Sequence, residues 1–396
     1  MRSFQVRAGR EFEANLPVGM SRSGLLIMRV LVIGGAGFIG SHLVDRFVKE
    51  GFQVRVLDSL DSRIHRGKPA YLPPQVEFIR GDVTDRERLS QALREVDVVS
   101  HQAAYQDYMP DFSRFLHVNA VGTALLYELI VQERLKVKKV IVASSQAVYG
   151  EGQYSCPEHG IFLPPPRRQQ LQEGKWEVTC PKCGQESVPT LLEEQYTNPY
   201  NQYAVSKLAQ EKTALGLGWL HGIPTVALRY SITQGPRQSL FNHYSGVCRI
   251  FVGRALRGKP LVIYEDGLQT RDFGHVQDAV EANMLVLRKD SADFEAFNVG
   301  SGRSTSVLEY AAAVGKKVGR RLELQFPGEY RRGDNRHSVS SITKLRALGW
   351  EPRHSLSSIL DDFLEWVEQS GGIPEQLQDA YSDMKGSGVV LVATVH

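Results

Sequence analysis

Residues 29–50, RVLVIGGAGFIGSHLVDRFVKE, give the clearest indication of the fold. Its first part, Arg29–Ile33, is a short apolar run that predicts a buried strand. Phe38–Glu50 has the pattern of a helix that lies against such a strand. A strand, a glycine-rich turn and a helix in this order indicate the start of an α/β domain.

Glycines recur between this strand and this helix with the spacing G-x-x-G-x-x-G. Gly34 allows a tight turn, Gly37 lets backbone N–H groups approach a pyrophosphate, and Gly40 allows close packing of the helix on the strand. The first helical residues, Phe38 and Ile39, lie where a helix N-terminus favours an anionic ligand. The loop therefore predicts a dinucleotide site, with a purely structural turn as the alternative.

An acidic residue follows the second predicted strand, Gln53–Leu57. Asp58 can accept hydrogen bonds from an adenosine ribose, and its charge would repel a 2′-phosphate. The sequence therefore favours NAD. Arg55 and Arg63 are nearby, so NADP remains an alternative.

Strands and helices continue to alternate along the chain, and Thr84 with Glu87 has the pattern of a capping box. Further strands are predicted at Val76–Ile79, Asp97–Ser100, Lys139–Ala143 and Thr225–Arg229, and helices at Ser113–Arg134, Tyr200–His221 and Arg249–Arg257. This alternation predicts an α/β fold, a Rossmann-type doubly wound parallel sheet with helices on both faces.

Changes in this pattern suggest the domain boundaries. We expect an N-terminal extension at 1–27 and an NAD-binding domain at 28–234, interrupted by an insertion at 151–197. Residues 235–370 are expected to form mainly a smaller C-terminal substrate-binding lobe. Residues 371–396 lack clear periodicity and are expected to be a tail.

Composition and charge exclude several classes of protein. The 396 residues are 42% hydrophobic and 23% charged, with a net charge of +3 and no block of basic residues, so no nucleic-acid partner is expected. We find no run of about 18 apolar residues, and therefore expect no membrane span. The charged N-terminus lacks the apolar core of a signal peptide, so the cytoplasm is the expected location.

A tyrosine and a lysine four residues apart, Tyr203 and Lys207, fall on one face of a predicted helix. A lysine ammonium beside a phenol lowers the pKa of the phenol, which lets tyrosine act as a base nearer neutral pH. Lys207 can also hold the nicotinamide ribose. Ser145 ends an apolar strand, at the sheet edge where ligands bind in open α/β folds.

With these residues the chain resembles the extended short-chain dehydrogenase/reductase superfamily, and within it the nucleotide-sugar epimerases and dehydratases. The matching motifs are GGAGFIG (34–40), GDVTD (81–85), VNAVGT (118–123), ASSQAVYG (143–150), YAVSK (203–207), LRY…GPRQ (228–238), RDFGHVQD (271–278), FNVGSG (297–302) and RRGDNR (331–336). The resemblance covers roughly residues 28–368 apart from the insertion.

The resemblance implies a role for each matching residue. Tyr203 is the acid/base, Lys207 its partner and Ser145 the hydrogen-bond donor to the sugar oxygen. Asp82 and Val83 flank the adenine, and Asn119 braces the active site. Arg271 and Arg331 contact the nucleotide or its phosphates, with surface salt bridges as the less favoured alternative. A homodimer formed through a pair of helices is also implied.

The residues after Ser145 bear on the reaction. Dehydratases of this family usually carry Asp-Glu there, and a decarboxylase usually carries a Glu, but here Gln146 and Ala147 follow. Neither can transfer a proton, so a 4-epimerase acting on a nucleotide-diphosphate sugar is favoured, with Gln146 as a substrate contact. A 4,6-dehydratase, another nucleotide-sugar oxidoreductase and a non-catalytic NAD-binding protein remain alternatives.

Other positions concern the sugar pocket. Ile232 stands where family members commonly have a substrate-binding Asn, so the sequence does not predict which sugar is bound. Residues after the fourth strand could line the pocket. They are Gln102, Tyr105, Gln106 and Tyr108.

The insertion holds two pairs of metal-binding residues, Cys156 with His159 and Cys180 with Cys183. Each pair has the C-x-x-(C/H) spacing of a zinc knuckle, and four such ligands suit tetrahedral Zn²⁺ with no open position. The sequence therefore predicts a structural zinc site, with unpaired surface cysteines as the alternative. Cys248 stands apart and is expected to be buried. We expect the insertion near the mouth of the active site, where it covers the substrate or a subunit interface.

Overall fold

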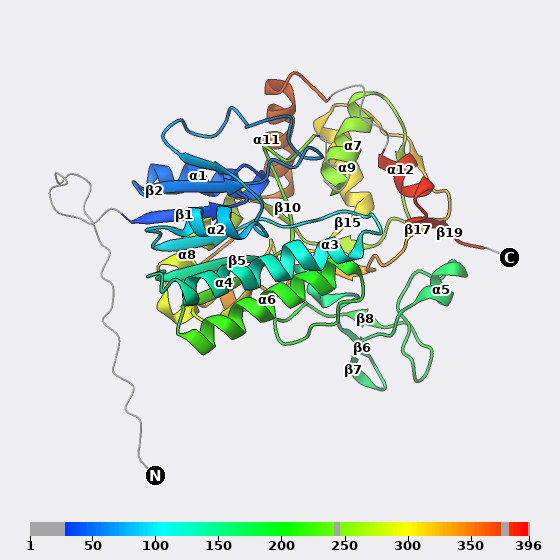
Figure 1. The fold of residues 1–396 in the computed structure, drawn as a ribbon. Coiled ribbons are helices and arrows are strands. Elements are labelled where there is room, and N and C mark those ends of the chain that lie inside the picture. Colours follow the sequence, from blue (N-terminus) through cyan, green and yellow to red (C-terminus); the bar gives the residue numbers. More distant parts are fainter. Residues whose placement is uncertain (1–27, 241–245, 374–379, 395–396) are drawn as a thin grey trace, which may run out of the picture.

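A seven-stranded parallel sheet organises the chain in the computed structural model, which describes residues 28–240, 246–373 and 380–394 (Figure 1). The strand order is β14-β9-β5-β4-β1-β2-β3. The bounds are β1 Arg29–Ile33, β2 Gln53–Asp58, β3 Glu77–Arg80, β4 Val98–His101, β5 Lys139–Ser145, β9 Thr225–Tyr230 and β14 Glu295–Val299. The predicted doubly wound Rossmann-type sheet is confirmed.

Alternate residues of β1 point to opposite faces of the sheet, and each face is covered by helices. Leu31 and Ile33 pack with residues of α2 (Arg86–Leu93), α4 (Gly122–Gln132) and α6 (Gln202–His221). Val30 and Val32 pack with α1 (Phe38–Lys49) and α8 (Val276–Leu287) on the other face. Because both faces are buried, the strands are nearly continuous apolar runs.

The predicted capping box at Thr84 is wrong. Asp85 caps α2, since its carboxylate accepts a hydrogen bond from the backbone N–H of Arg88 at 3.1 Å. Thr84 instead donates its hydroxyl to Asp82 at 2.8 Å. Aspartate is at least as good an N-cap as threonine, so the helix starts one residue later than the pattern suggested.

One long helix runs from Phe112 to Gln132, made of α3 (Phe112–Leu116), a π turn (His117–Val121) and α4. By length and composition alone it could cross a membrane, which differs from our reading of the sequence. It is a core helix of this fold, because Leu126, Leu129 and Ile130 pack on the sheet.

The second lobe is built from short strands and helices. Its sheets pair β10 (Ile232–Gln234) with β13 (Phe273–His275), β11 (Leu261–Val262) with β16 (Leu324–Gln325), β12 (Thr270–Arg271) with β15 (Thr305–Ser306) and β18 (His337–Ser338), and β17 (Glu329–Arg331) with β19 (Val390–Val392). Helices α7 (Gly246–Leu256), α9 (Val307–Lys317) and α11 (Leu356–Gln369) enclose a separate apolar core. α8 and β14, which lie within 235–370, return to the large sheet, beside which α10 (Thr343–Arg346) packs.

The end of the chain differs from the tail that we expected. Residues 380–392 contain α12 (Ala380–Gly386) and β19, and β19 pairs antiparallel with β17. Their order comes from this pairing with a strand some 60 residues away, which sequence periodicity does not register. The N-terminal extension, 1–27, lies outside the described residues.

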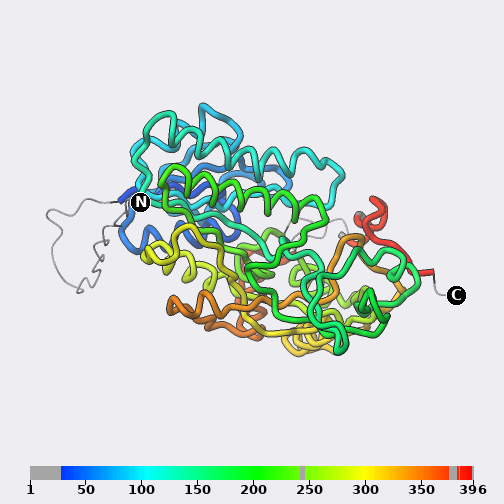
Figure 2. The backbone as a smooth tube through the Cα atoms, turned by 90° about the horizontal axis from the view of Figure 1, so that it is seen from below, coloured from blue at the N-terminus to red at the C-terminus, as the bar shows by residue number. Residues whose placement is uncertain are grey.

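The insertion forms a small body beside the second lobe (Figures 1 and 2). It contains a three-stranded sheet, β7 (Gly160–Phe162), β6 (Tyr154–Cys156) and β8 (Val188–Pro189), and the short helix α5 (Arg168–Gln172). It starts just after the 3-10 helix Gln146–Tyr149 that follows β5. The insertion is thus attached directly at the end of the strand that carries Ser145.

Candidate active site

A cavity of about 960 Å³ lies at the carboxyl edge of the large sheet, where the second lobe meets it. All but one of the residues predicted to bind cofactor or substrate or to act in catalysis line it. They are Gly34, Gly37, Phe38, Ile39, Gly40, Asp58, Asp82, Val83, Ser145, Gln146, Tyr203, Lys207, Arg271 and Arg331. The exception is Asn119, which lies behind the wall. Gln102, Tyr105, Gln106 and Tyr108 line the cavity too.

The glycine loop leaves room for a ligand because side chains are excluded from it. A Cβ on Gly34 would lie 2.6 Å from the backbone N of Ala103, and one on Gly40 would lie 2.1 Å from the carbonyl oxygen of Gly34. Gly34 also has a φ of +79°, which favours glycine. Among the described residues no side chain caps α1, so the first backbone N–H groups of this helix, on residues that line the cavity, stay available to an anionic ligand.

Asp58 stiffens this loop from the end of β2. Its carboxylate accepts hydrogen bonds from the backbone N–H of Ala36 and of Leu60, both at 2.9 Å. Arg55 is turned away from the cavity and donates to the carbonyl oxygens of Ala92 and Arg94. Arg63 does line the cavity, but it is bonded to Asp61, the Tyr105 hydroxyl and Asp107. The arrangement therefore fits the ribose of NAD better than a 2′-phosphate.

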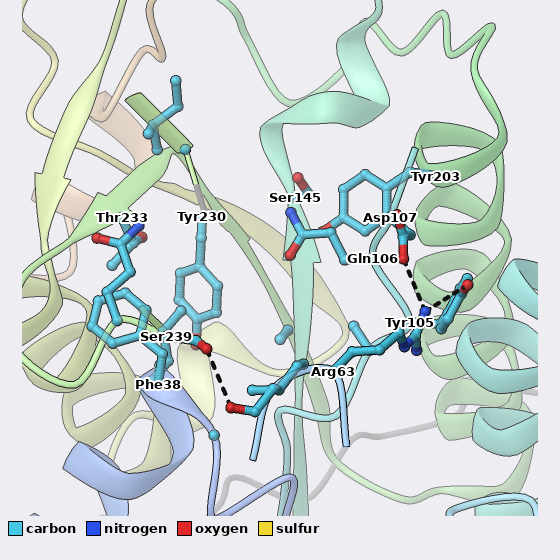
Figure 3. Close-up of a pocket in the computed structure, with 18 of the residues that line it drawn as sticks. Phe38, Arg63, Tyr105, Gln106, Asp107, Ser145, Tyr203, Tyr230, Thr233 and Ser239 are labelled. Carbon is cyan, nitrogen blue, oxygen red and sulfur yellow. Dashed lines mark hydrogen bonds and ion pairs between the residues drawn. The ribbon is translucent and has the colours of Figure 1, made fainter. Parts of the chain in front are cut away.

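Ser145 and Tyr203 meet at the cavity wall, one from the end of β5 and the other from the first turn of α6 (Figure 3). They share a hydrogen bond, which lowers the pKa of Tyr203, but burial outweighs it and raises that pKa to about 12. The sequence predicted that Lys207 lowers the pKa of Tyr203 below its usual value. The structure does not bear this out, because the pKa of Tyr203 is raised.

Lys207 lies one helical turn further along α6 and is buried. Its ammonium donates hydrogen bonds to the carbonyl oxygen of Ala143 and the side-chain oxygen of Gln210. Burial lowers the pKa of Lys207 to about 7, although the charge of Glu211 opposes that shift. Burial thus keeps the Tyr203 phenol protonated at neutral pH and brings the pKa of Lys207 close to neutral pH.

Asn119 sits in the π turn behind the cavity and links α6 to the loop that carries Tyr105. Its amide donates to the Ser206 hydroxyl at 2.9 Å, and its side-chain oxygen accepts from the backbone N–H of Tyr105 at 2.7 Å. Ser206 stands between Tyr203 and Lys207 in the chain. Asn119 therefore holds both α6 and the loop that carries Tyr105, in keeping with a bracing role.

The side-chain oxygen of Gln146 is buried and has no hydrogen-bond partner among the described residues. Gln146 immediately follows Ser145 and lines the cavity together with Ala147. A buried polar atom without a partner costs about 1–3 kcal/mol, which a ligand that donates a hydrogen bond would recover. This orphan acceptor supports the prediction that Gln146 contacts a substrate.

Several tyrosines of the cavity wall were missed in the sequence. Tyr230 ends β9, accepts a hydrogen bond from Asn283 at 2.7 Å and reaches Gln102 at 3.2 Å. Its place at the end of a strand could have identified it. Tyr264 and Tyr381 come from the second lobe and α12, and no local signal marks them.

Arg271 and Arg331, which also line the cavity, are both held by the carboxylate of Asp334. Asp334 lies 3.5 Å from the Arg271 guanidinium and 2.7 Å from that of Arg331. Arg331 also bonds the Tyr108 hydroxyl. Both are part of a shaped wall and not of an open surface, which favours a ligand role over simple surface salt bridges.

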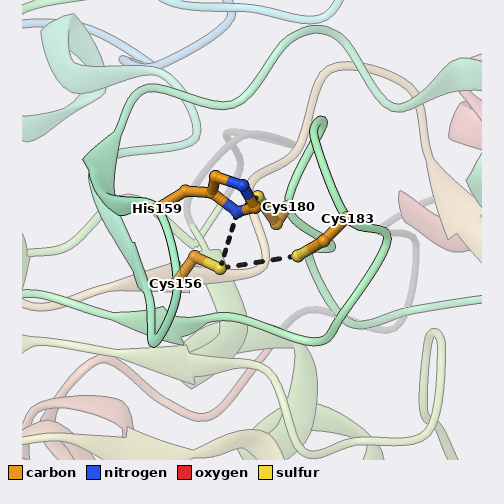
Figure 4. A group of neighbouring side chains, drawn as sticks. All are labelled: Cys156, His159, Cys180 and Cys183. Atoms are coloured by element: carbon orange, nitrogen blue, oxygen red, sulfur yellow. Dashed lines mark hydrogen bonds between the residues drawn. The ribbon is translucent and has the colours of Figure 1, made fainter.

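The four predicted metal ligands converge in the insertion (Figure 4). Cys156 Sγ lies 3.6 Å from both His159 Nδ1 and Cys183 Sγ, and Cys180 Sγ lies 3.6 Å from His159 Nδ1. All four ligand atoms are within 4.8 Å of one another. Cys248 is buried in α7, apart from this group.

Comparison with known proteins adds independent findings. The profile of the NAD dependent epimerase/dehydratase family matches residues 30–169 and 179–300. The dTDP-L-rhamnose 4-epimerase of Burkholderia thailandensis is 32% identical over 350 residues, which cover 86% of this chain and 95% of that protein.

Two solved structures are similar over nearly their whole length. UDP-glucose 4-epimerase of Thermus thermophilus in complex with NAD is 32% identical, with a TM-score of 0.69, over 86% of this chain and 99% of that one. UDP-glucuronic acid 4-epimerase of Bacillus cereus, in complex with UDP-glucuronic acid and NAD, is 26% identical, with a TM-score of 0.71, over 87% of this chain and 100% of that one.

Proposed function

Because the chain belongs to the NAD dependent epimerase/dehydratase family, we propose that it is a nucleotide-sugar 4-epimerase that uses NAD. The observation that carries the proposal is the cavity itself. It joins the glycine loop to Ser145, Tyr203 and Lys207, and it carries Gln146 and Ala147 where a dehydratase needs groups that transfer protons.

The residues present fit NAD. A Cβ would fill the cradle at Gly34 and Gly40, the open N-terminus of α1 suits a pyrophosphate, and Asp58 suits a ribose. Asp82 and Val83 would lie beside the adenine. When bound, the cofactor accepts a hydride from the sugar and gives it back.

In the proposed mechanism Tyr203 moves the proton at the sugar 4-hydroxyl. Its Oη takes this proton as the hydride leaves C4, and it returns the proton after the ketosugar has turned in the cavity. Ser145, hydrogen-bonded to Tyr203, donates to the same sugar oxygen. Lys207 would hold the nicotinamide ribose and, when protonated, favours the phenolate form of Tyr203.

We propose that the substrate is a sugar linked to a nucleoside diphosphate. Arg271 and Arg331 face the cavity with cationic groups that suit a diphosphate. Gln146 offers its unpartnered oxygen to a sugar hydroxyl. Ile232, which lines the cavity where family members commonly have a substrate-binding Asn, offers the sugar an apolar side chain.

We also propose that the insertion binds one structural zinc ion through Cys156, His159, Cys180 and Cys183. Tetrahedral zinc with Zn–S bonds of about 2.3 Å and a Zn–N bond of about 2.0 Å needs ligand atoms about 3.5–3.8 Å apart. The three measured separations of 3.6 Å fit this geometry. Four protein ligands leave no open position, so the ion would be structural.

A homodimer is proposed on the exposed apolar side chains of two neighbouring helices. Val121, beside α4, and Val205 and Trp219 of α6 are 49%, 42% and 71% exposed. Sedimentation should give about twice the mass of the 44.3 kDa chain. A Trp219→Glu variant should shift it towards the monomer, and a monomeric parent protein would contradict the proposal.

The experiment that tests the proposed function is incubation with UDP-, dTDP- and GDP-sugars. We expect formation of the C4 epimer of at least one of them without net NADH. A 4-keto-6-deoxy product or stoichiometric NADH would instead indicate a dehydratase or another oxidoreductase. Tight NAD binding without turnover of any sugar would indicate a non-catalytic protein.

A further inference from the structure

The insertion has two arms, and each carries one pair of the proposed metal ligands. β6 and the turn before β7 carry Cys156 and His159. The hairpin 178–187, closed by the bridge between Thr179 and Glu186, carries Cys180 and Cys183. A metal bound between the pairs would therefore tie the two arms together (Figure 4).

Each arm also places one carboxylate on the same residue of the second lobe, Arg336. Glu151, which precedes β6, accepts a hydrogen bond from the backbone N–H of Arg336 at 2.6 Å and another from the Tyr154 hydroxyl at 3.2 Å. Glu177, which adjoins the hairpin, accepts one from the Arg336 guanidinium at 2.9 Å. Both arms thus hold Arg336, one by its backbone and one by its side chain.

The Arg336 side chain is fully buried, so it depends on these partners. Glu265 and Asp266 of the second lobe complete its surroundings, at 2.8 and 2.7 Å. Burial lowers the pKa of Arg336, but hydrogen bonds with Asp266 and Glu177 outweigh it, so the side chain keeps its charge. Removal of one partner of a buried ion pair is strongly unfavourable, and the segment around Arg336 would shift to restore solvation.

The segment around Arg336 contacts Arg271 and Arg331, two arginines that line the cavity. The Arg271 guanidinium donates to the carbonyl oxygens of Asn335 and Arg336, at 2.8 and 2.9 Å. Asp334, which directly precedes Asn335 in the chain, pairs with both Arg271 and Arg331. β12, which holds Arg271, also pairs with β18, which follows Arg336. A displacement of Arg336 is therefore transmitted within one or two residues to both arginines.

We propose that the metal-linked insertion positions Arg271 and Arg331, the two cavity arginines that would bind the diphosphate of the substrate. Glu177 and Arg336 are the positioning residues through which it acts. This inference rests on the proposed function. The insertion takes no part in the chemistry at the sugar, because none of its metal ligands lines the cavity. Disruption of the insertion should therefore weaken substrate binding and leave the rate of the chemical step nearly unchanged.

The test compares Glu177→Gln, which keeps the size of the side chain but removes its charge, with Glu173→Gln. Glu173 is an exposed residue of the same insertion, paired with exposed Lys175. Binding of UDP and dTDP to the NAD-loaded enzyme is measured by calorimetry, together with KM, kcat and zinc content. For Glu177→Gln we expect the dissociation constant and KM to rise at least tenfold, with kcat within about twofold and zinc retained.

Glu173→Gln should bind as the parent does, whereas Cys183→Ser should lose zinc and show the same weakened binding as Glu177→Gln. Unchanged UDP and dTDP affinity in Glu177→Gln, or a fall in kcat at constant KM, overturns the inference and leaves the proposed function intact. A parent enzyme that binds neither nucleoside diphosphate instead contradicts the proposed substrate class, and this inference with it.

Discussion

Tyr203 and Ser145 share a hydrogen bond at the wall of the cavity, although 57 positions of the chain separate them and the whole insertion lies in between. The parallel sheet brings them together, because β5 ends where α6 begins its first turn against it. The pair is therefore fixed by the main fold, and the insertion can vary without disturbing it.

Tyr203→Phe should lower kcat by about 10²–10⁴-fold, because the acid/base is lost. NAD released from the heat-denatured variant should match that from the parent, since the phenyl ring keeps its packing. Tyr196→Phe, which changes a partly exposed tyrosine outside the cavity, is the control and should keep full activity. Near-normal turnover by Tyr203→Phe would refute this residue as the base.

Gln146→Leu should weaken substrate binding without weakening the fold. The buried oxygen of Gln146 has no partner among the described residues, so its removal should leave the free energy of unfolding unchanged or raise it by about 1 kcal/mol. KM should rise about tenfold as the contact to the sugar is lost. Gln91→Leu, on an exposed position of α2, provides the control for both measurements. An unchanged KM would contradict the contact.

His101 should make the protein less stable in acid. Burial lowers its pKa to about 3, so the neutral ring contributes stability that is complete above pH 6.5 and is lost as the pH falls towards 3. Relative to His101→Gln, the parent should lose about 2 kcal/mol of unfolding free energy between pH 7 and pH 5. Denaturant titrations at both pH values measure it. His117→Gln, which changes an exposed histidine, is the control for the substitution itself. If the difference in unfolding free energy between the parent and His101→Gln is the same at both pH values, His101 is not held neutral by burial.

Protein purified without chelator should contain one zinc per chain by elemental analysis. Cys183→Ser should lose the metal and unfold at a lower temperature, because bound structural zinc contributes directly to folding. Cys248→Ala, which removes the thiol outside the cluster, should keep the zinc. Metal-free parent protein would rule out the zinc site.

The parts of the site that the sequence predicted are those with a local signature. The glycine loop is a strand, a turn and a helix in direct succession, and the pair Tyr203 and Lys207 occupies one helical turn. The metal ligands likewise form two short pairs, each within a single turn of the chain. In each case a few neighbouring residues carry both the geometry and the chemistry.

The parts that were missed depend on contacts between distant segments. Tyr381 reaches the cavity only because β19 pairs with β17, and that pairing leaves no periodic pattern in the sequence. Arg336 gathers acids from positions 151, 177, 265 and 266, none of which is distinctive on its own. The expected lowering of the Tyr203 pKa was wrong for the same reason, since burial by the whole fold raises that pKa and outweighs the hydrogen bond with Ser145.

In the proposed reaction hydride leaves C4 and returns to it within one catalytic cycle. The most direct test is turnover of an accepted nucleotide sugar that carries deuterium at C4, with the product analysed by NMR and mass spectrometry. We predict that the C4 epimer keeps its deuterium at C4, with no net formation of NADH. Loss of the label from C4, its transfer to another carbon or its accumulation in NADH would contradict the account.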